Sequence, residues 1–245
     1  MNTMPNTQET KTCNVMDISN RNSNYKNRCV KLRKEIREPV QPIKSKDDIE
    51  YIKNYLINKK QRYNTIQLRD YTLFVIGINL SRRIGDLLSI TVGDILNKNG
   101  TFKNEFYIIS QKKQKQECII LSQNTKDILS MYFTTNPELI QDMNNHLFPS
   151  RQSENKSMSY STAYYIMKNI EKEINKTKTD INDNLKLSTH SLRKTRAFWY
   201  IKNHKNDEYA ILKVSKALGH SDTKTTMAYL GLDKKELEDY YNEEI

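Results

Sequence analysis

The chain has 245 residues, which is enough for one large domain or for one domain preceded by a short arm. With 36% hydrophobic and 28% charged residues, and no apolar run of membrane-spanning length, the composition argues against a membrane protein. The polar N-terminus lacks the apolar core of a secretory signal. Cys13, Cys29 and Cys118 are scattered, which argues against a disulfide scaffold and a zinc site and favours a cytoplasmic location.

The formal net charge is +11, from 40 Lys and Arg against 29 Asp and Glu. This excess is compatible with a nucleic-acid partner, although a coding bias toward lysine is an alternative source. The run 26–37 is strongly basic, whereas 232–245 is predominantly acidic. Because phosphates would repel an acidic segment, we expect residues 232–245 to contact protein.

Hydrophobic periodicity predicts a chain of helices after a polar start. We interpret residues 1–42 as a basic, flexible arm that ends at Pro39 and Pro42, and 43–245 as the folded domain. A first amphipathic helix follows Ser45, a typical N-cap residue. The further helical patterns cover residues 65–80, 125–133, 161–174, 191–202 and 207–218, and Gly219 is expected to stop the last of these.

Two short β-rich runs interrupt the helices. EFYIIS at 105–110 and ECIIL at 117–121 are separated by the basic, glutamine-rich stretch 111–116. This pattern predicts a hairpin with a basic turn. The predicted fold class is therefore mainly α with a small antiparallel β-sheet.

Four short motifs contain residue types suited to chemistry on an anion. The stretch RIGDLL contains Arg83, and HSLR places His190 and Arg193 on one helical face. LGH contains His220, and Tyr229 follows it by nine residues after a threonine-rich run. Taken singly, each motif is also compatible with a solvated surface pair or with a packed tyrosine.

Their order along the chain carries more information. R-I-G-D-L-L, a basic hairpin, H-S-L-R, L-G-H and T-T-x-x-Y follow one another, with an L-F-P-S run at 147–150 between them. This arrangement resembles the tyrosine recombinases, the phage-integrase family, over about residues 43–245. The resemblance implies the catalytic-domain fold of the DNA breaking-rejoining enzymes.

The resemblance also implies roles for individual residues. Asp86 would support the site, and Lys113 or, less well, Lys115 are alternatives for the catalytic lysine, as Arg82 is for the first arginine. Tyr240 and Tyr241 lie in the acidic segment, and Tyr200 and Tyr209 fall in helices with core-like patterns. The implied catalytic residues are the arginines Arg83 and Arg193, the lysine Lys112, the histidines His190 and His220, and the nucleophile Tyr229.

These residue types fit phosphodiester chemistry without a metal or another cofactor. Two guanidiniums stay charged and can stabilise the negative charge of the transition state. A phenol with a pKa near 10 needs a proton acceptor, for which His190 is the candidate. Lys112 can donate a proton to the leaving 5′ oxygen, and His220 can hydrogen-bond the phosphate.

The chain departs from the family pattern at several positions. Leu80 and Ser81 stand where a Thr-Gly pair is usual, Thr189 replaces a proline before the H-x-L-R histidine, and Ile120 replaces a proline at the end of the hairpin. These differences concern backbone geometry. With only about 40 residues before the catalytic portion, we expect a compact member without a full N-terminal core-binding domain, similar to the fimbrial-switch invertases.

The expected partner is double-stranded DNA with specific recombination sites. The DNA contacts we expect involve Arg33, Lys113, Lys115 and Lys194. The resemblance implies a homotetramer on DNA, joined through C-terminal segments, with DNA-bending accessory proteins as possible further partners. The alternatives are a type IB topoisomerase-like relaxing enzyme and a DNA-binding accessory factor without catalysis.

Overall fold

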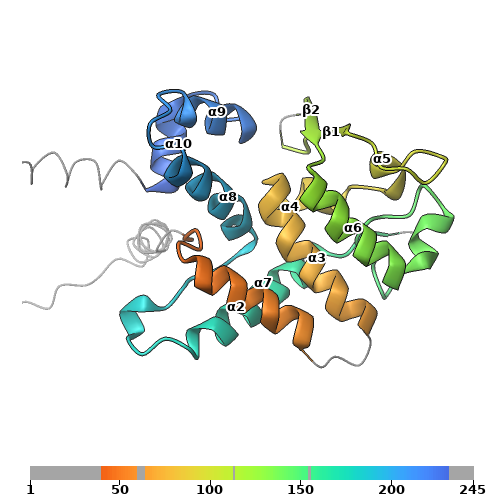
Figure 1. The fold of residues 1–245 in the computed structure, drawn as a ribbon, viewed down its shortest axis with the longest axis horizontal. Coiled ribbons are helices and arrows are strands. Elements are labelled where there is room, and N and C mark those ends of the chain that lie inside the picture. The colour runs from red at the N-terminus through yellow and green to blue at the C-terminus, as the bar shows by residue number, and fades with distance from the viewer. Residues whose placement is uncertain (1–39, 60–63, 113, 154–155, 232–245) are drawn as a thin grey trace, which may run out of the picture. The chain divides into compact units, whose positions relative to one another are not determined.

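Figure 1 shows the fold in a computed structural model, which describes residues 40–59, 64–112, 114–153 and 156–231. Helices dominate, and the described residues contain one two-stranded antiparallel sheet, as the sequence predicts. The elements are α2 (Lys46–Asn58), α3 (Asn64–Leu80), α4 (Ile84–Leu88), α5 (Val92–Ile95), β1 (Glu105–Ile109), β2 (Gln116–Ile120), α6 (Gln123–Thr135), η1 (Pro137–Gln141), α7 (Tyr160–Asn175), η2 (Ile181–Asp183), α8 (Thr189–Asn203), α9 (Ala210–Ala217) and α10 (Thr223–Leu230).

Helix α3 lies at the centre of the main core. It packs on α2, α6 and α8, and its residues Phe74 and Ile76 are fully buried. At Gly77 a Cβ atom would lie only 2.5 Å from Cδ1 of Leu192, so α3 and α8 approach each other closely there. This approach places the C-terminal end of α3 next to the part of α8 that follows Leu192.

The hairpin has one buried and one exposed face. Phe106 pairs with Ile119 on the buried face, whereas Ile109 and Ile120 point outward and are 66% and 74% exposed. Strand alternation explains this division. At the base of the connection between the strands, the Ser110 amide donates to the Lys115 carbonyl over 2.9 Å.

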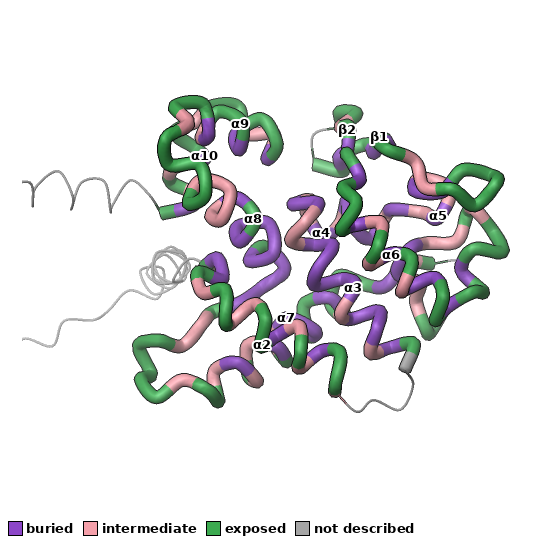
Figure 2. Tube along the Cα trace, viewed as in Figure 1, coloured by how far each residue is buried: buried purple, intermediate pink, exposed green. Residues whose placement is uncertain are grey.

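A second, smaller core holds the C-terminal helices. Helices α9 and α10 pack on each other and on α8, around Val214, Leu218 and Leu230. Figure 2 shows that exposed residues make up much of these two helices, whereas α3 is mostly buried. Gly219 (φ +59°) follows α9, in agreement with the predicted stop.

The predicted helices are confirmed with small shifts at their ends. The helix predicted from residue 207 begins only at Ala210, because the Asp207 side chain accepts from the Tyr209 amide over 3.0 Å and forms a turn. Tyr209 is 63% exposed, so its core-like pattern was misleading. Helices α4 and α5 were not predicted, since they span only five and four residues.

Candidate active site

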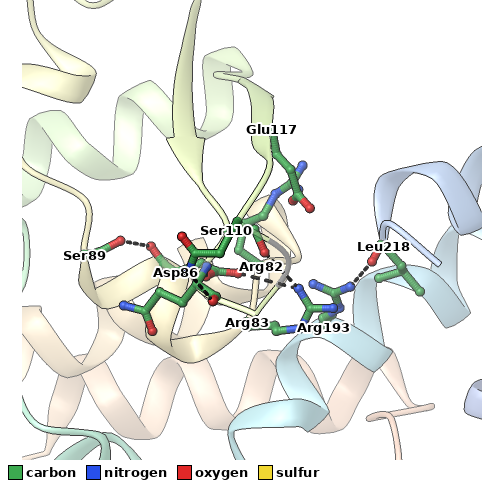
Figure 3. A network of polar contacts seen from close by, with 10 residues as sticks. Arg82, Arg83, Asp86, Ser89, Ser110, Glu117, Arg193 and Leu218 are labelled. Carbon is green, nitrogen blue, oxygen red and sulfur yellow. Dashed lines mark hydrogen bonds and ion pairs between the residues drawn. The ribbon is translucent and has the colours of Figure 1, made fainter. Parts of the chain in front are cut away.

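Arg83 stands where α3 ends and α4 begins. Its guanidinium lies 3.8 Å from the buried Asp86 carboxylate and donates to the Ser110 hydroxyl over 3.3 Å. The other Asp86 oxygen accepts from the Gln111 amide over 2.9 Å (Figure 3). Asp86 therefore connects the arginine to the start of the hairpin turn, which fits the supporting role expected for it.

The turn before Arg83 contains a residue in an unusual conformation. Ser81 has φ +55°, in the left-handed region that favours glycine, and it occupies the position where the family usually has glycine. Its hydroxyl donates to the Arg193 carbonyl over 3.3 Å. The backbone thus adopts a conformation that a glycine would favour, although the side chain differs.

Arg193 is the more deeply buried of the two arginines. It is 3% exposed, and its guanidinium donates to the Leu218 carbonyl at the end of α9 (Figure 3). Burial lowers the pKa of Arg193 to about 10, and the neighbouring Arg83 acts in the same direction. At pH 7 the group is still protonated, so it presents a desolvated positive charge.

His190 lies in the first turn of α8, which Ser188 caps. The pKa of His190 is lowered from its usual value of 6.5 by desolvation and then by the positive charges of Arg193, Lys194, Arg83 and Lys112. The imidazole is therefore neutral at pH 7 and can accept a proton.

His220 and Tyr229 face each other across the turn between α9 and α10. Their rings meet edge to face, with centroids 5.3 Å apart. A hydrogen bond of 2.9 Å joins His220 Nδ1 to the hydroxyl of Thr226, which is fully buried. Thr226 therefore holds the histidine from the buried side of α10.

The phenol of Tyr229 is buried at its oxygen atom. The hydroxyl makes no hydrogen bond of standard geometry within the described residues, although Arg193 lies near enough to favour its ionised form. Desolvation raises the pKa of Tyr229, whereas Arg193 and Arg83 oppose that shift. The two guanidiniums therefore act on this phenol directly.

One cavity of about 370 Å³ brings all six implied catalytic side chains together. They come from the N-terminal end of α4, the hairpin turn, α8, the α9–α10 turn and α10. Gly219, Ser221 and Thr225 complete the lining, and none of them was given a role in the site from the sequence alone. The lining residues are Arg83, Lys112, His190, Arg193, Gly219, His220, Ser221, Thr225 and Tyr229.

The competing residues lie elsewhere. Arg82 does not line this cavity and instead pairs with Glu117. The geometry therefore favours Arg83 over Arg82 as the first arginine of the site. Lys115 lines a neighbouring pocket together with Gly219 and His220. Lys113 and Arg33, like the acidic segment 232–245, lie outside the described residues.

The structure places Lys194, one of the residues expected to contact DNA, beside Tyr229. Only 9% of the residue is exposed, and its ammonium lies 4.5 Å from the centroid of the Tyr229 ring.

Sequence reasoning missed the groups that hold the catalytic side chains. Ser110 accepts from Arg83, and Thr226 is bonded to His220. The three-residue spacing from Thr226 to Tyr229 was the available signal, since it places both residues on one face of α10.

Two features are absent from the described residues. No group of three or more His, Cys, Asp or Glu side chains there could hold a metal ion. In the same part of the chain, no helix has the length and apolar character needed to cross a membrane.

Comparisons with known proteins agree with the motif pattern. The profile of the phage integrase family matches residues 45–236. A probable integrase/recombinase, YoeC of Bacillus subtilis (strain 168), is 32% identical over 197 residues, covering 80% of this chain and 91% of the relative. The chain belongs to the phage integrase family of tyrosine recombinases.

Solved structures support the fold. The site-specific recombinase XerH bound to its palindromic difH substrate is 20% identical with a TM-score of 0.58, covering 83% of this chain and 52% of that one. The chain thus spans about half the length of that protein. The Tn1549 transposon integrase in complex with transposon right-end DNA is 16% identical with a TM-score of 0.59, covering 83% of this chain and 67% of that one.

Proposed function

We propose that this protein is a site-specific DNA recombinase that cuts and rejoins strands through a 3′-phosphotyrosyl intermediate. The observation that carries the proposal is the single cavity lined by two arginines, a lysine, two histidines and a tyrosine. The relatives support it, since XerH is a site-specific recombinase bound to its substrate DNA.

Tyr229 is the proposed nucleophile. Its phenol oxygen attacks the phosphorus, the bond between phosphorus and the 5′ oxygen breaks, and a phosphotyrosyl ester remains on the 3′ side. His190 accepts the phenol proton, and its lowered pKa keeps the imidazole in the neutral form that can do so at pH 7. Lys112 donates a proton to the departing 5′ oxygen.

Charge on the phosphate is balanced by fixed groups. Arg83 and Arg193 neutralise the non-bridging oxygens, and His220 donates a hydrogen bond. A second strand's 5′-hydroxyl reverses the reaction, and the ester conserves the energy of the backbone bond, so no ATP is needed.

The partners belong to the same proposal. Double-stranded DNA with recombination sites is the substrate, and the enzyme acts as a tetramer in the cytoplasm. The acidic segment 232–245 contacts a neighbouring protomer, and the basic run with Arg33 contacts phosphates, as do Lys113 and Lys115.

A nicked suicide substrate tests the chemistry. DNA segments flanking the gene supply candidate sites, and a nick next to the scissile phosphate lets the short 5′-hydroxyl strand diffuse away and trap the adduct. We expect a covalent complex with the native protein and none with Tyr229→Phe. The matched control is Tyr209→Phe, because Tyr209 is exposed and does not line the cavity.

The results also separate the alternatives. Adduct formation by Tyr229→Phe, or none by the native protein on any flanking site, would contradict the proposal. Relaxation of supercoiled DNA without any specific site would favour a topoisomerase-like activity.

A further inference from the structure

Lys194 presents its charged end to the ring of Tyr229. The ammonium lies 4.5 Å from the ring centroid, on the neighbouring helix α8, and the residue is only 9% exposed. A lysine that packs only through its aliphatic stem normally keeps the ammonium in water. Here the ammonium itself is desolvated, and burial lowers the pKa of Lys194.

The aromatic face is the partner that the structure offers to this charge. Among the described residues, Lys194 forms no ion pair with a carboxylate. A cation over a phenol ring is attracted by the negative face of the ring. The same cation attracts the phenolate more strongly, because ionisation adds negative charge that spreads into the ring.

Among the described residues, no acidic side chain lines the cavity around Tyr229. Arg83 approaches from α4 and Arg193 from α8, and both oppose the desolvation that raises the pKa of the phenol. The charged or titratable side chains that line the cavity with Tyr229 or face its ring, among the described residues, are Arg83, Lys112, His190, Arg193, Lys194 and His220. Lys194 differs from the rest of this set because it faces the ring and does not line the cavity.

We propose that Lys194 is a positioning residue for the nucleophile, which holds the Tyr229 ring beside α8 and favours ionisation of its phenol. This inference rests on the proposed function of Tyr229 as the nucleophile. It replaces our expectation that Lys194 contacts DNA, because its ammonium is directed at a protein ring.

The first test measures single-turnover cleavage across pH by native protein, Lys194→Met and Lys194→Arg. The substrate is a suicide DNA with a bridging 5′-phosphorothiolate, whose thiolate leaves without a proton, so the rate reports on the nucleophile. We expect Lys194→Met to be slower by about tenfold at pH 7, equivalent to about one pKa unit. Lys194→Arg keeps the charge and should stay within about threefold of the native rate.

The pH profile of cleavage shows in which direction the charge of Lys194 shifts the pKa values of the site. Removing a positive charge raises the pKa of Tyr229, and it also raises that of His190, whose pKa Lys194 helps to lower. The profile of Lys194→Met should therefore move to higher pH, while that of Lys194→Arg stays in place. An unshifted profile with a native rate would overturn the inference.

DNA binding is measured separately in Tyr229→Phe protein, so that no adduct forms. We expect Lys194→Met to leave the dissociation constant and its salt dependence unchanged in that background. A weaker complex with a salt slope reduced by about one, together with native cleavage at saturating DNA, would assign Lys194 to a phosphate instead.

A test without DNA separates this inference from the proposed function. In a double-mutant cycle of Lys194→Met and Tyr229→Leu, followed by thermal unfolding, the two losses of stability should be less than additive. Additive losses of stability would contradict an interaction between Lys194 and Tyr229, even if DNA cleavage by Tyr229 were established. Coupled losses without any covalent adduct would overturn the catalytic role alone.

Discussion

The frame formed by α2 to α8 and the C-terminal pair α9–α10 contribute different parts of one site. The frame encloses a large buried core and carries Arg83, Lys112, His190 and Arg193. The C-terminal pair carries His220 and Tyr229 on a core that contains few buried residues in the described chain. The positively charged side chains that would bind the phosphate therefore lie in the well-packed region, whereas the nucleophile lies in the thinly packed region.

The two regions therefore differ in the rigidity that their parts of the site require. An electrostatic site works best when its charges are fixed before the reaction, because then no reorganisation is needed. A nucleophile on helices with few buried contacts belongs to the part of a fold that opens most easily. The Arg193 guanidinium connects the two, since it donates to the Leu218 carbonyl at the end of α9.

The largest expected effect comes from the two arginines. Arg83→Gln and Arg193→Gln should each slow cleavage by about 10²–10³-fold, because each removes one charge from the phosphate site. Arg193→Gln should also speed amide hydrogen exchange in 210–231, since it removes the bond to Leu218. Equal exchange in both variants would contradict the connecting role of Arg193.

A pair of leucine variants separates the two cores. Leu129→Ala, in the main core, should lower the free energy of unfolding by about 2–5 kcal/mol, measured by denaturant titration. Leu230→Ala should cost less, because the C-terminal cluster lies close to the surface and can relax. In folded protein, however, Leu230→Ala should reduce cleavage more than Leu129→Ala does. A larger loss of cleavage in Leu129→Ala than in Leu230→Ala would contradict the division of roles between the two cores.

The pH dependence tests the neutral state of His190 in the frame. Its pKa is lowered below 6.5, so the second-order rate constant for adduct formation should stay level down to about pH 6.5. Further acidification protonates the acceptor, and the rate then falls about tenfold per pH unit. His204→Ala is the control, because His204 stacks on Tyr200 outside the cavity. A decline that begins above pH 6.5 would contradict the assignment.

The smallest effect concerns the turn that positions Arg83. Ser81→Gly relieves the left-handed backbone strain of about 1 kcal/mol, whereas Ser81→Ala keeps the strain and loses the bond to the Arg193 carbonyl. We expect Ser81→Gly to unfold at a temperature higher than Ser81→Ala by a few degrees. Equal midpoints would mean that the turn is not strained at Ser81.

Long helices and the order of the motifs were predictable from the sequence. α3 is a long, mostly apolar run and α8 spans 15 residues, and the motifs around Arg83, Arg193 and His220 could be ordered along the chain. Periodicity could not find α4 and α5, which are shorter than two turns.

Contacts between distant residues were not predictable from the sequence. The Lys194 ammonium over the Tyr229 ring depends on how α8 and α10 pack, and the bond from Thr226 to His220 depends on the turn after α9. The positive φ of Ser81 was not expected either, since serine rarely adopts it. The division into two cores likewise follows from packing and not from any local pattern.

The central claim is that the phenol of Tyr229 becomes bonded to a DNA phosphate. Mass spectrometry of protease-digested adduct from the suicide substrate tests it most directly. We predict that the peptide containing Tyr229 carries the DNA through a 3′-phosphate, with Lys194→Arg protein giving the same peptide. DNA attached to any other tyrosine, or attached through a 5′-phosphate, would contradict this account of the site.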